Sequence, residues 1–268
     1  MVISFLKKLV ISCVPESVYQ RVRLLYLCLR WGVLVLPKAE YKYNAAGLVT
    51  AKNCDFMKEP AFIQASEAGQ NQFDRLDPNF LGGGGWVRHL NLWAGFHAKQ
   101  LDGDFVECGV FRGGNAKAIM TYINYKEMKG RKYYLFDTFR GLDERYSSKD
   151  ELDSYVGAYS NDVYPFVVDS FKDFPNVEIV RGAIPETLTR VDIKKVAFLS
   201  IDMNCVLPEM EALKFFWPKM VPGGIVVLDD YGWGGSHDRQ KEAQDKFAES
   251  VGVKIFTLPT GQGMMIKP

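Results

Sequence analysis

The chain has 268 residues, 47% of them hydrophobic and 24% charged, a composition that excludes a disordered or collagen-like protein. This length suits one large α/β domain with a modest extension. The 33 Lys and Arg residues balance 32 Asp and Glu residues, so no broad basic field faces a nucleic-acid backbone, and we expect no nucleic-acid partner.

The five cysteines are odd in number and scattered, at positions 13, 28, 54, 108 and 205. They lack the paired spacing of a zinc site or of a disulfide framework. We therefore expect a cytoplasmic protein in a reducing environment.

The N-terminal residues 1–37 are apolar, but charged residues from Lys7 to Arg30 interrupt every stretch long enough to cross a bilayer. This segment also lacks a small-residue cleavage site after a clean apolar core, so we predict neither a transmembrane helix nor a signal peptide. We expect helices that pack on the main domain or on a second copy in a homo-oligomer. Peripheral contact with a membrane surface is the alternative.

Residues 41–81 show poor periodicity, and the glycines at positions 82–85 follow them as a predicted flexible joint. Residues 86–101 then show the apolar spacing of a helix. We accordingly predict an N-terminal helical and irregular extension over residues 1–85 and a second domain over residues 86–268.

From residue 104 onward, short apolar stretches alternate with helix-like segments, which is the pattern of a parallel sheet with crossover helices. The predicted strands are 104–110, 132–138, 177–183, 196–203, 224–231, 253–258 and 263–268. The turn between the last two is too short for a helix, so they should form an antiparallel hairpin. The predicted fold class is α/β: a doubly wound, mostly parallel seven-stranded sheet of Rossmann-like type that ends in this hairpin.

The first predicted strand leads into a glycine-rich turn. It contains Glu107 and ends at Gly109, and Gly113 and Gly114 open the helix that follows. Such glycines let the backbone approach a ligand closely. Asp137 ends the next strand, where a carboxylate can accept hydrogen bonds from the two hydroxyls of a ribose. Together they predict a nucleoside site, and the glycine spacing differs from that of nicotinamide enzymes.

Three carboxylates follow two later strands: Asp202 ends the fourth, and Asp229 and Asp230 end the fifth. If these strands are neighbours, the carboxylates repel one another and need a cation or raised pKa values. An all-oxygen set suits Mg²⁺ or a similar hard ion. In the alternative interpretation, one Asp caps a helix and another pairs with an Arg.

Two histidines are candidate bases, because a neutral imidazole can accept a proton near pH 7. His237 lies just after the carboxylate pair and before a helix, where it either faces the same pocket or is exposed at the helix start. His89 is the second candidate, on the helix after the glycines, whereas we expect His97 to serve packing.

Residues 144–176 form a long connection that is rich in Tyr and Phe. This segment either covers the substrate, or presents Tyr164, Phe166, Phe171 and Phe174 as the buried face of an ordinary helix.

Five stretches of the sequence, in this order and spacing, resemble the class I S-adenosylmethionine-dependent methyltransferases. More closely they resemble the macrocin O-methyltransferase family, whose members act on sugars of macrolide antibiotics. The stretches are GDFVECGVFRGG (103–114), YLFDTFRGLDE (134–144), VRGAIPETL (180–188), SIDMN (200–204) and PGGIVVLDDYGW (222–233). The resemblance covers residues 86–268 and implies a methyltransferase domain there.

The resemblance implies a donor site built around the glycine turn and the strand ends beside it. The predicted donor-binding residues are Glu107, Gly109, Gly113, Gly114, Asp137, Thr138, Gly182 and Ala183. Of these, Glu107, Gly109 and Gly113 would hold the methionine part of S-adenosylmethionine. Asp137 would hold the ribose, and Gly182 with Ala183 would lie by the adenine.

The resemblance also implies that Asp202, Asp229 and Asp230 bind Mg²⁺, which in the family grips neighbouring hydroxyls of the sugar. Family members often carry a second Asp two residues after the first, where this chain has Asn204, and an Asn side chain still offers an oxygen ligand.

The predicted function is Mg²⁺-assisted O-methylation of a hydroxyl on a sugar or another small natural product, with His237 and Asp202 as the catalytic residues. One alternative is a metal-independent N- or carboxyl-methyltransferase. Another is a non-catalytic protein that binds a nucleoside or acts as a scaffold.

Overall fold

The computed structural model describes residues 42–45, 47–72, 84–156, 159 and 161–268. The chain separates into two compact units, Met1–Lys42 and Tyr43–Pro268, and the second contains the helices and strands given below. Among the described residues, no helix combines the length and the apolar character that crossing a membrane requires. The predictions for residues 1–41 and for the glycines at 82 and 83 fall outside the described residues.

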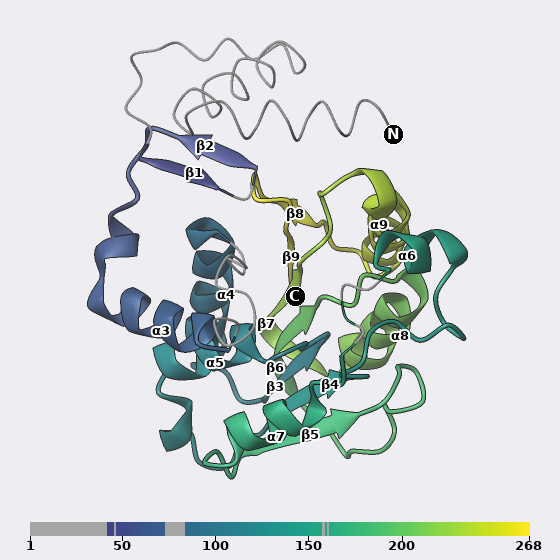
Figure 1. The fold of residues 1–268 in the computed structure, drawn as a ribbon, viewed down its shortest axis with the longest axis horizontal. Helices are drawn as coiled ribbons and strands as arrows, with labels where there is room; N and C mark the ends of the chain where they lie inside the picture. The colour runs from purple at the N-terminus through teal and green to yellow at the C-terminus, as the bar shows by residue number, and fades with distance from the viewer. Residues whose placement is uncertain (1–41, 46, 73–83, 157–158, 160) are drawn as a thin grey trace, which may run out of the picture. The chain divides into compact units, whose positions relative to one another are not determined.

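A seven-stranded sheet with the strand order β5-β4-β3-β6-β7-β9-β8 forms the centre of the second unit (Figure 1). Its strands are β3 (Asp104–Cys108), β4 (Tyr133–Asp137), β5 (Val177–Arg181), β6 (Val196–Ile201), β7 (Met220–Leu228), β8 (Phe256–Thr257) and β9 (Gly263–Ile266). The pairs from β5 to β7 are parallel, and β9 runs antiparallel to both β7 and β8. This confirms the predicted mostly parallel sheet with its closing hairpin.

Seven helices are described around the sheet. They are α3 (Pro60–Gln70), α4 (Gly85–Ala98), α5 (Gly114–Tyr122), α6 (Lys149–Ser154), α7 (Tyr164–Phe171), α8 (Val206–Phe216) and α9 (Asp238–Ser250). A separate hairpin of β1 (Tyr43–Ala45) and β2 (Leu48–Thr50) precedes α3. The helix predicted over residues 86–101 is α4, which begins one residue earlier and ends three residues sooner.

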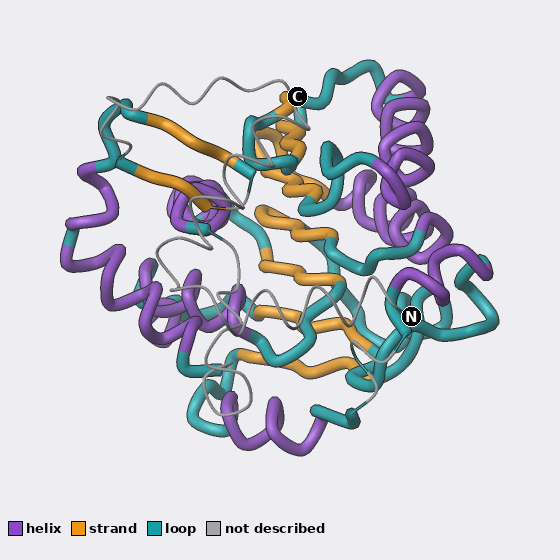
Figure 2. The backbone as a smooth tube through the Cα atoms, turned by 45° about the horizontal axis from the view of Figure 1, so that its top comes forward, coloured by secondary structure: helices purple, strands orange, loops and turns teal. Residues whose placement is uncertain are grey.

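Side chains of the central strands alternate between two apolar cores, one on each face of the sheet. On β4, Tyr133 and Leu135 pack in the core that α3, α4, α5 and α7 complete, whereas Tyr134 and Phe136 pack in the core that α8 and α9 complete. Figures 1 and 2 show these two groups of helices on opposite sides of the strands. Because both faces are covered, the functional groups must gather at the strand ends.

Helix α3 crosses α5 at very short range. A Cβ on Gly69 would lie 2.7 Å from the carbonyl oxygen of Gly114, so the small residue permits the contact. Residues from Tyr43 onward belong to the same compact unit as the sheet. The domain boundary predicted between residues 85 and 86 stays a prediction, and part of the predicted extension packs directly on the sheet domain.

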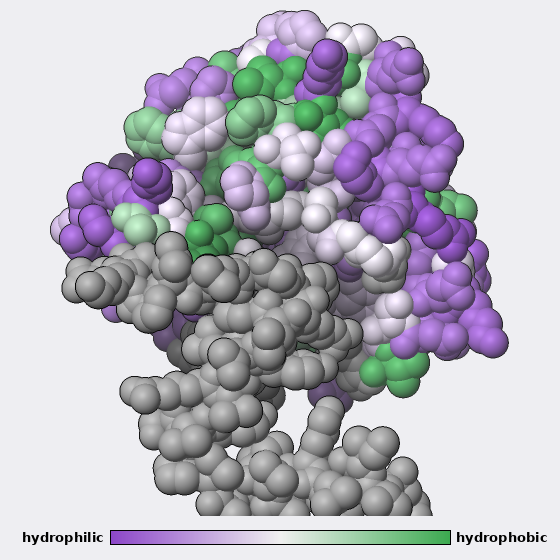
Figure 3. Space-filling view, turned by 90° about the horizontal axis from the view of Figure 1, so that it is seen from above, coloured by the Kyte–Doolittle hydropathy of each residue, from purple (hydrophilic) through white to green (hydrophobic). Residues whose placement is uncertain are grey.

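Helix α9 is charged on its outer side and carries two buried glutamines, Gln240 and Gln244, on its inner side. Figure 3 shows hydrophilic residues gathered on the right of the face seen from above, the side on which Figure 1 places α6 and α9. Because these side-chain amides are buried, they need hydrogen-bond partners inside the protein. Their shared partner lies beside the cavity described next.

Candidate active site

A cavity of about 540 Å³ opens beyond the C-terminal ends of β3, β4, β6 and β7. β3 and β6 are adjacent where the strand order reverses direction, which is the place where doubly wound folds bind ligands. The cavity brings together the predicted site residues except Gly113 and His89, the second candidate base. Those that line it are Glu107, Gly109, Gly114, Asp137, Thr138, Gly182, Ala183, Asp202, Asp229, Asp230 and His237.

Two glycines of the turn after β3 have positive φ angles, for different reasons. Gly109 has a φ of +89°, and a Cβ there would lie 1.7 Å from the carbonyl oxygen of Asp202, so glycine is required for the ends of β3 and β6 to meet. Gly113 has a φ of +80°, and a Cβ there would lie 2.5 Å from the Phe171 ring of α7. Gly113 therefore serves the packing of α7, and its contact with a donor stays a prediction.

The Asp137 carboxylate organises the glycine turn through backbone amides. Its Oδ2 accepts hydrogen bonds from the amides of Val110 (2.6 Å) and Phe111 (2.7 Å), and its Oδ1 accepts one from Phe139 (2.6 Å). Charge-assisted bonds of this kind are about twice as strong as neutral ones. Asp137 thus holds the turn in place, and its predicted contact with a ribose stays a prediction.

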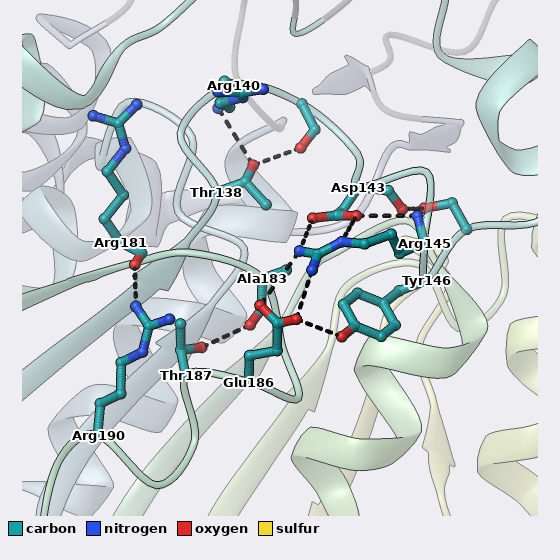
Figure 4. A network of polar contacts seen from close by, with 12 residues as sticks. Thr138, Arg140, Asp143, Arg145, Tyr146, Arg181, Ala183, Glu186, Thr187 and Arg190 are labelled. Carbon is teal, nitrogen blue, oxygen red and sulfur yellow. Dashed lines mark hydrogen bonds and ion pairs between the residues drawn. The ribbon is translucent and has the colours of Figure 1, made fainter.

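Thr138, Gly182 and Ala183 line one end of the cavity. At this end, a network of polar contacts connects two loops (Figure 4). Arg145 pairs with Asp143 at 2.7 Å and with Glu186 at 2.6 Å, and the Tyr146 hydroxyl donates to Glu186 at 2.8 Å. Arg145 and Glu186 are exposed, so solvent screens these pairs and they add little to the stability of the fold. Their role is to connect the loop after β4 with the segment after β5.

Asp202, Asp229 and Asp230 offer three carboxylate oxygens that all lie within 4.8 Å of one another. Burial, and then repulsion from Asp229 and Asp230, raises the pKa of Asp202 well above its usual value; the pKa of Asp230 is likewise raised, first by burial and then by Asp229. One oxygen of Asp230 is buried without a hydrogen-bond partner in the described part of the chain. A hard divalent cation such as Mg²⁺ would fit this oxygen set, bond the orphaned atom and relieve the repulsion.

The imidazole of His237 is held by hydrogen bonds at both ring nitrogens. Its Nε2 lies 3.1 Å from the hydroxyl of Tyr155, and its Nδ1 lies 2.8 Å from Oε1 of Gln240. The amide nitrogen of Gln240 donates to Glu209, so its oxygen must face His237. This arrangement favours the proton on Nδ1, with Nε2 accepting from the Tyr155 hydroxyl, and His237 lines the cavity.

Glu209 anchors this arrangement from α8 and is almost completely buried. Gln240 and Gln244 donate to its two oxygens at 2.9 and 2.8 Å, and the Met203 amide adds a third bond at 3.2 Å. Burial raises the pKa of Glu209 to about 7, and these hydrogen bonds oppose that rise. No pattern in the sequence pointed to Glu209 or Gln240.

The aromatic residues between β4 and β5 fall into two groups, one that lines the cavity and one that packs against the apolar core. Tyr155 and Tyr159 line the cavity, and burial first of all raises the pKa of Tyr159 to about 12. The four aromatic residues predicted as a helix face pack against the apolar core instead: Tyr164, Phe166, Phe171 and Phe174. The alternative of an ordinary helix face is therefore confirmed for α7 and the residues after it.

The other two histidines lie away from this cavity. His89, the second candidate base, stacks on Phe56 with ring centroids 3.9 Å apart and is absent from the cavity lining, so the structure does not place it with the carboxylates. His97 contacts the carbonyl oxygen of Gly223 through Nε2 at 2.9 Å, which fits the expected packing role. Ring stacking in an apolar layer uses His89 as a flat aromatic group rather than as a base.

Among the further residues that line the cavity are three polar or aromatic ones that sequence reasoning did not assign to it: Arg88 and Asn91 of α4, and Trp233 after β7. Arg88 and Asn91 are three residues apart and therefore share one face of the helix. A polar pair at this spacing on an otherwise apolar helix was the available signal. Nothing local indicated that this face borders a ligand site.

The sheet order, the glycine turn after its central strand and the polar strand ends around one cavity define a class I S-adenosylmethionine-dependent methyltransferase. The family described as macrocin O-methyltransferase (TylF) matches residues 88–255, well over half of the sequence. The chain belongs to this family.

Individual relatives are distant. A Streptomyces olivaceus protein named 8-demethyl-8-(2,3-dimethoxy-alpha-L-rhamnosyl)-tetracenomycin-C 4'-O-methyltransferase is 23% identical over 162 residues, which cover 57% of this chain and 62% of the relative. Mycinamicin III 3''-O-methyltransferase of Micromonospora griseorubida is 21% identical over 70% of this chain and 75% of that protein. Among solved structures, the O-methyltransferase NovP superposes with a TM-score of 0.61 at 19% identity, covering 69% of this chain and 80% of NovP. That structural likeness concerns the fold.

Proposed function

We propose that the protein transfers a methyl group from S-adenosylmethionine to a hydroxyl of a sugar or sugar-bearing natural product, with assistance from Mg²⁺. The observation that carries this proposal is the placement of His237 and the three carboxylates in one cavity with the glycine turn. The names of the relatives, which act on sugar-bearing antibiotics, support the choice of acceptor class.

Asp202, Asp229 and Asp230 would hold the cation, which when bound supplies Lewis acidity that makes a nearby hydroxyl easier to deprotonate. His237 accepts the acceptor's proton at Nε2; this nitrogen accepts from the Tyr155 hydroxyl at 3.1 Å, so the hydroxyl of the acceptor would take the place of that contact. Tyr155 and Tyr159 line the same cavity. The remaining work is alignment, because the methyl donor is already activated.

The experiment has two stages. Calorimetry first measures binding of S-adenosylmethionine and of S-adenosylhomocysteine, and a protein that binds neither is not a methyltransferase of this kind. Turnover is then followed on a panel of glycosylated natural products, with Mg²⁺ and with EDTA. Turnover that survives EDTA would remove the cation from the proposal, and methylation confined to amines or carboxylates would remove the hydroxyl acceptor.

A further inference from the structure

Trp233 is an exposed aromatic residue of the cavity that takes no part in the carboxylate cluster or in the contacts of His237. It lies in the segment between β7 and α9 and is 52% exposed. A single exposed apolar side chain is common on protein surfaces and needs no explanation by itself. The contacts that hold this indole, and the groups beside it, indicate a function.

The indole is fixed by a hydrogen bond and by a close backbone contact. Its Nε1 donates to the carbonyl oxygen of Asp229 at 3.2 Å. Gly261, in the turn between β8 and β9, lies so near that a Cβ there would be 3.2 Å from both Cδ1 and Nε1 of the indole. The Gly232 amide donates to the Gly261 carbonyl at 2.5 Å and joins the two segments. The ring is therefore held in one orientation while much of the residue stays exposed.

The same turn also fixes the carboxylate of Asp229. The side-chain amide of Gln262 donates to Asp229 Oδ1 at 2.9 Å, and Gln262 Oε1 accepts from the Thr260 hydroxyl at 3.1 Å. Both of these turn residues are buried. Asp229 thus contacts the indole through its backbone carbonyl and belongs to the carboxylate cluster through its side chain, so the aromatic ring borders the cluster.

A rigid, exposed aromatic ring beside a set of oxygen ligands is suited to a cyclic polyol. In a pyranose, axial C–H bonds point outward from the two faces of the ring, whereas equatorial hydroxyls project from its edge. The weakly positive C–H groups of such a face pack favourably on the negative face of an indole. A sugar ring that lies flat on Trp233 can therefore direct hydroxyls from its edge toward the carboxylates. An open-chain polyol offers the same hydroxyls but no face to stack.

We propose that Trp233 selects cyclic acceptors: its indole stacks on the apolar face of a pyranose ring and places an edge hydroxyl at the carboxylate cluster. This inference rests on the proposed function, in which that hydroxyl receives the methyl group. The stacking contact is the same in the ground state and in the transition state, so its loss should raise KM more than it lowers kcat.

Saturation-transfer NMR with two small polyols tests the stacking directly. Methyl β-D-glucopyranoside presents a pyranose face, and D-glucitol is an open-chain polyol. Each is added at millimolar concentration to protein saturated with S-adenosylhomocysteine and Mg²⁺. The ring C–H protons of the glucoside should receive at least about threefold more saturation than the glucitol protons. Equal signals, or none from the glucoside, would overturn the inference alone, whereas failure to bind S-adenosylhomocysteine would overturn the proposed function with it.

Two variants separate the aromatic face from the hydrogen bond of the indole. Trp233→Phe and Trp233→Leu both lose the Nε1 contact with Asp229, and only Trp233→Leu also loses the flat ring. Trp233→Leu should raise KM for the acceptor found by the turnover screen roughly tenfold, change kcat less than about threefold, and reduce the glucoside signal to that of glucitol. Trp233→Phe should retain most of the wild-type KM and signal.

Trp93→Leu is the matched control, because Trp93 is also an exposed tryptophan, at 44%, and does not line the cavity. It should behave as the wild type does in both measurements. A wild-type KM and glucoside signal in Trp233→Leu would overturn the inference. Equal losses in Trp233→Phe and Trp233→Leu would also overturn it, because they would assign the effect to the hydrogen bond rather than to stacking.

Discussion

The amide nitrogen of Gln240 donates a hydrogen bond of 2.9 Å to Oε1 of Glu209. A carboxylate only accepts, so this contact decides which way the Gln240 amide points and directs its oxygen to Nδ1 of His237. A residue on α8 thereby sets the tautomer of a histidine that precedes α9. The preferred proton acceptor at the cavity is a consequence of how these two helices pack.

Replacing Gln240 with Leu should reduce turnover roughly tenfold, because the imidazole then loses the contact that keeps its proton on Nδ1. Replacing His237 with Ala should reduce turnover by roughly 10²–10⁴-fold, the range for a lost general base. The measurements are initial rates on the acceptor found by the turnover screen, together with ¹⁵N chemical shifts of the His237 ring in the wild type and in Gln240→Leu.

Gln244→Leu is the control for that experiment. Gln244 also donates to Glu209, at 2.8 Å, and lies one turn further along α9. Both variants remove one hydrogen bond from the same buried carboxylate, so each should lower the free energy of unfolding by about 1–3 kcal/mol. Only Gln240→Leu should change the ring nitrogen shifts. Equal loss of turnover in the two variants would show that destabilisation, not tautomer control, is responsible.

The carboxylate cluster predicts how Mg²⁺ should act at different pH values. The pKa values of Asp202 and Asp230 are raised in the folded protein, so above the usual carboxyl pKa the folded state binds more protons than the unfolded state. Stability from these groups is therefore present at low pH and is lost as pH rises toward their raised pKa values. A bound cation removes that loss, because it favours the ionised carboxylates.

Addition of Mg²⁺ should accordingly raise the melting temperature more at pH 8 than at pH 5. Glu107 and Glu209 also have raised pKa values, so they make the melting temperature depend on pH even without Mg²⁺. The quantity to compare is therefore the change in melting temperature that Mg²⁺ causes at each pH. Asp230→Asn should abolish that shift, whereas Asp192→Asn, at an exposed ion pair with Lys194, should leave it intact. An identical shift at both pH values would contradict a role of these carboxylates in binding the ion.

The sequence was sufficient for the sheet and for the residues at its strand ends. Short apolar stretches, turns and intervening helices predicted the strands, and parallel pairing of neighbours places their C-terminal ends at one edge. Asp202 and Asp229 were expected to meet if their strands were neighbours, and the structure shows that β6 and β7 are adjacent. The cluster follows from topology alone.

The sequence did not predict the site residues whose positions depend on how helices pack against one another. Glu209 and Gln240 are 31 positions apart and meet only because α8 and α9 lie side by side. Arg88 enters the cavity from a helix that precedes the sheet, and its spacing from Asn91 is that of any two residues on one helix face. His89 shows the same limit: its residue type made it a candidate base, and only the packing shows that its ring stacks on Phe56.

Gly109 should tolerate no side chain. Besides its φ of +89°, a Cβ would lie 1.7 Å from the backbone of Asp202, so Gly109→Ala must separate the ends of β3 and β6. We expect a loss of more than about 4 kcal/mol in the free energy of unfolding, or no folded protein. Gly130→Ala is the control, with a φ of +76° and no atom within 4 Å of the added Cβ, and it should cost about 1–2 kcal/mol. Urea unfolding compares them, and similar costs would mean that strand contact is not the reason for glycine.

Asp137→Asn separates two roles for this acid. If Asp137 mainly holds the glycine turn, Asp137→Asn removes one of the two oxygens that accept from the three backbone amides. The NH₂ group that replaces this oxygen is a donor and faces backbone donors, which should cost about 3 kcal/mol of unfolding free energy. Affinity for S-adenosylhomocysteine should fall with it, since the turn borders the cavity. Asp162→Asn is the control, because Asp162 accepts from the Tyr164 amide and pairs with Arg181 at the surface, and it should leave the free energy of unfolding nearly unchanged. Unchanged stability in Asp137→Asn together with lost affinity would instead assign Asp137 to the ribose alone.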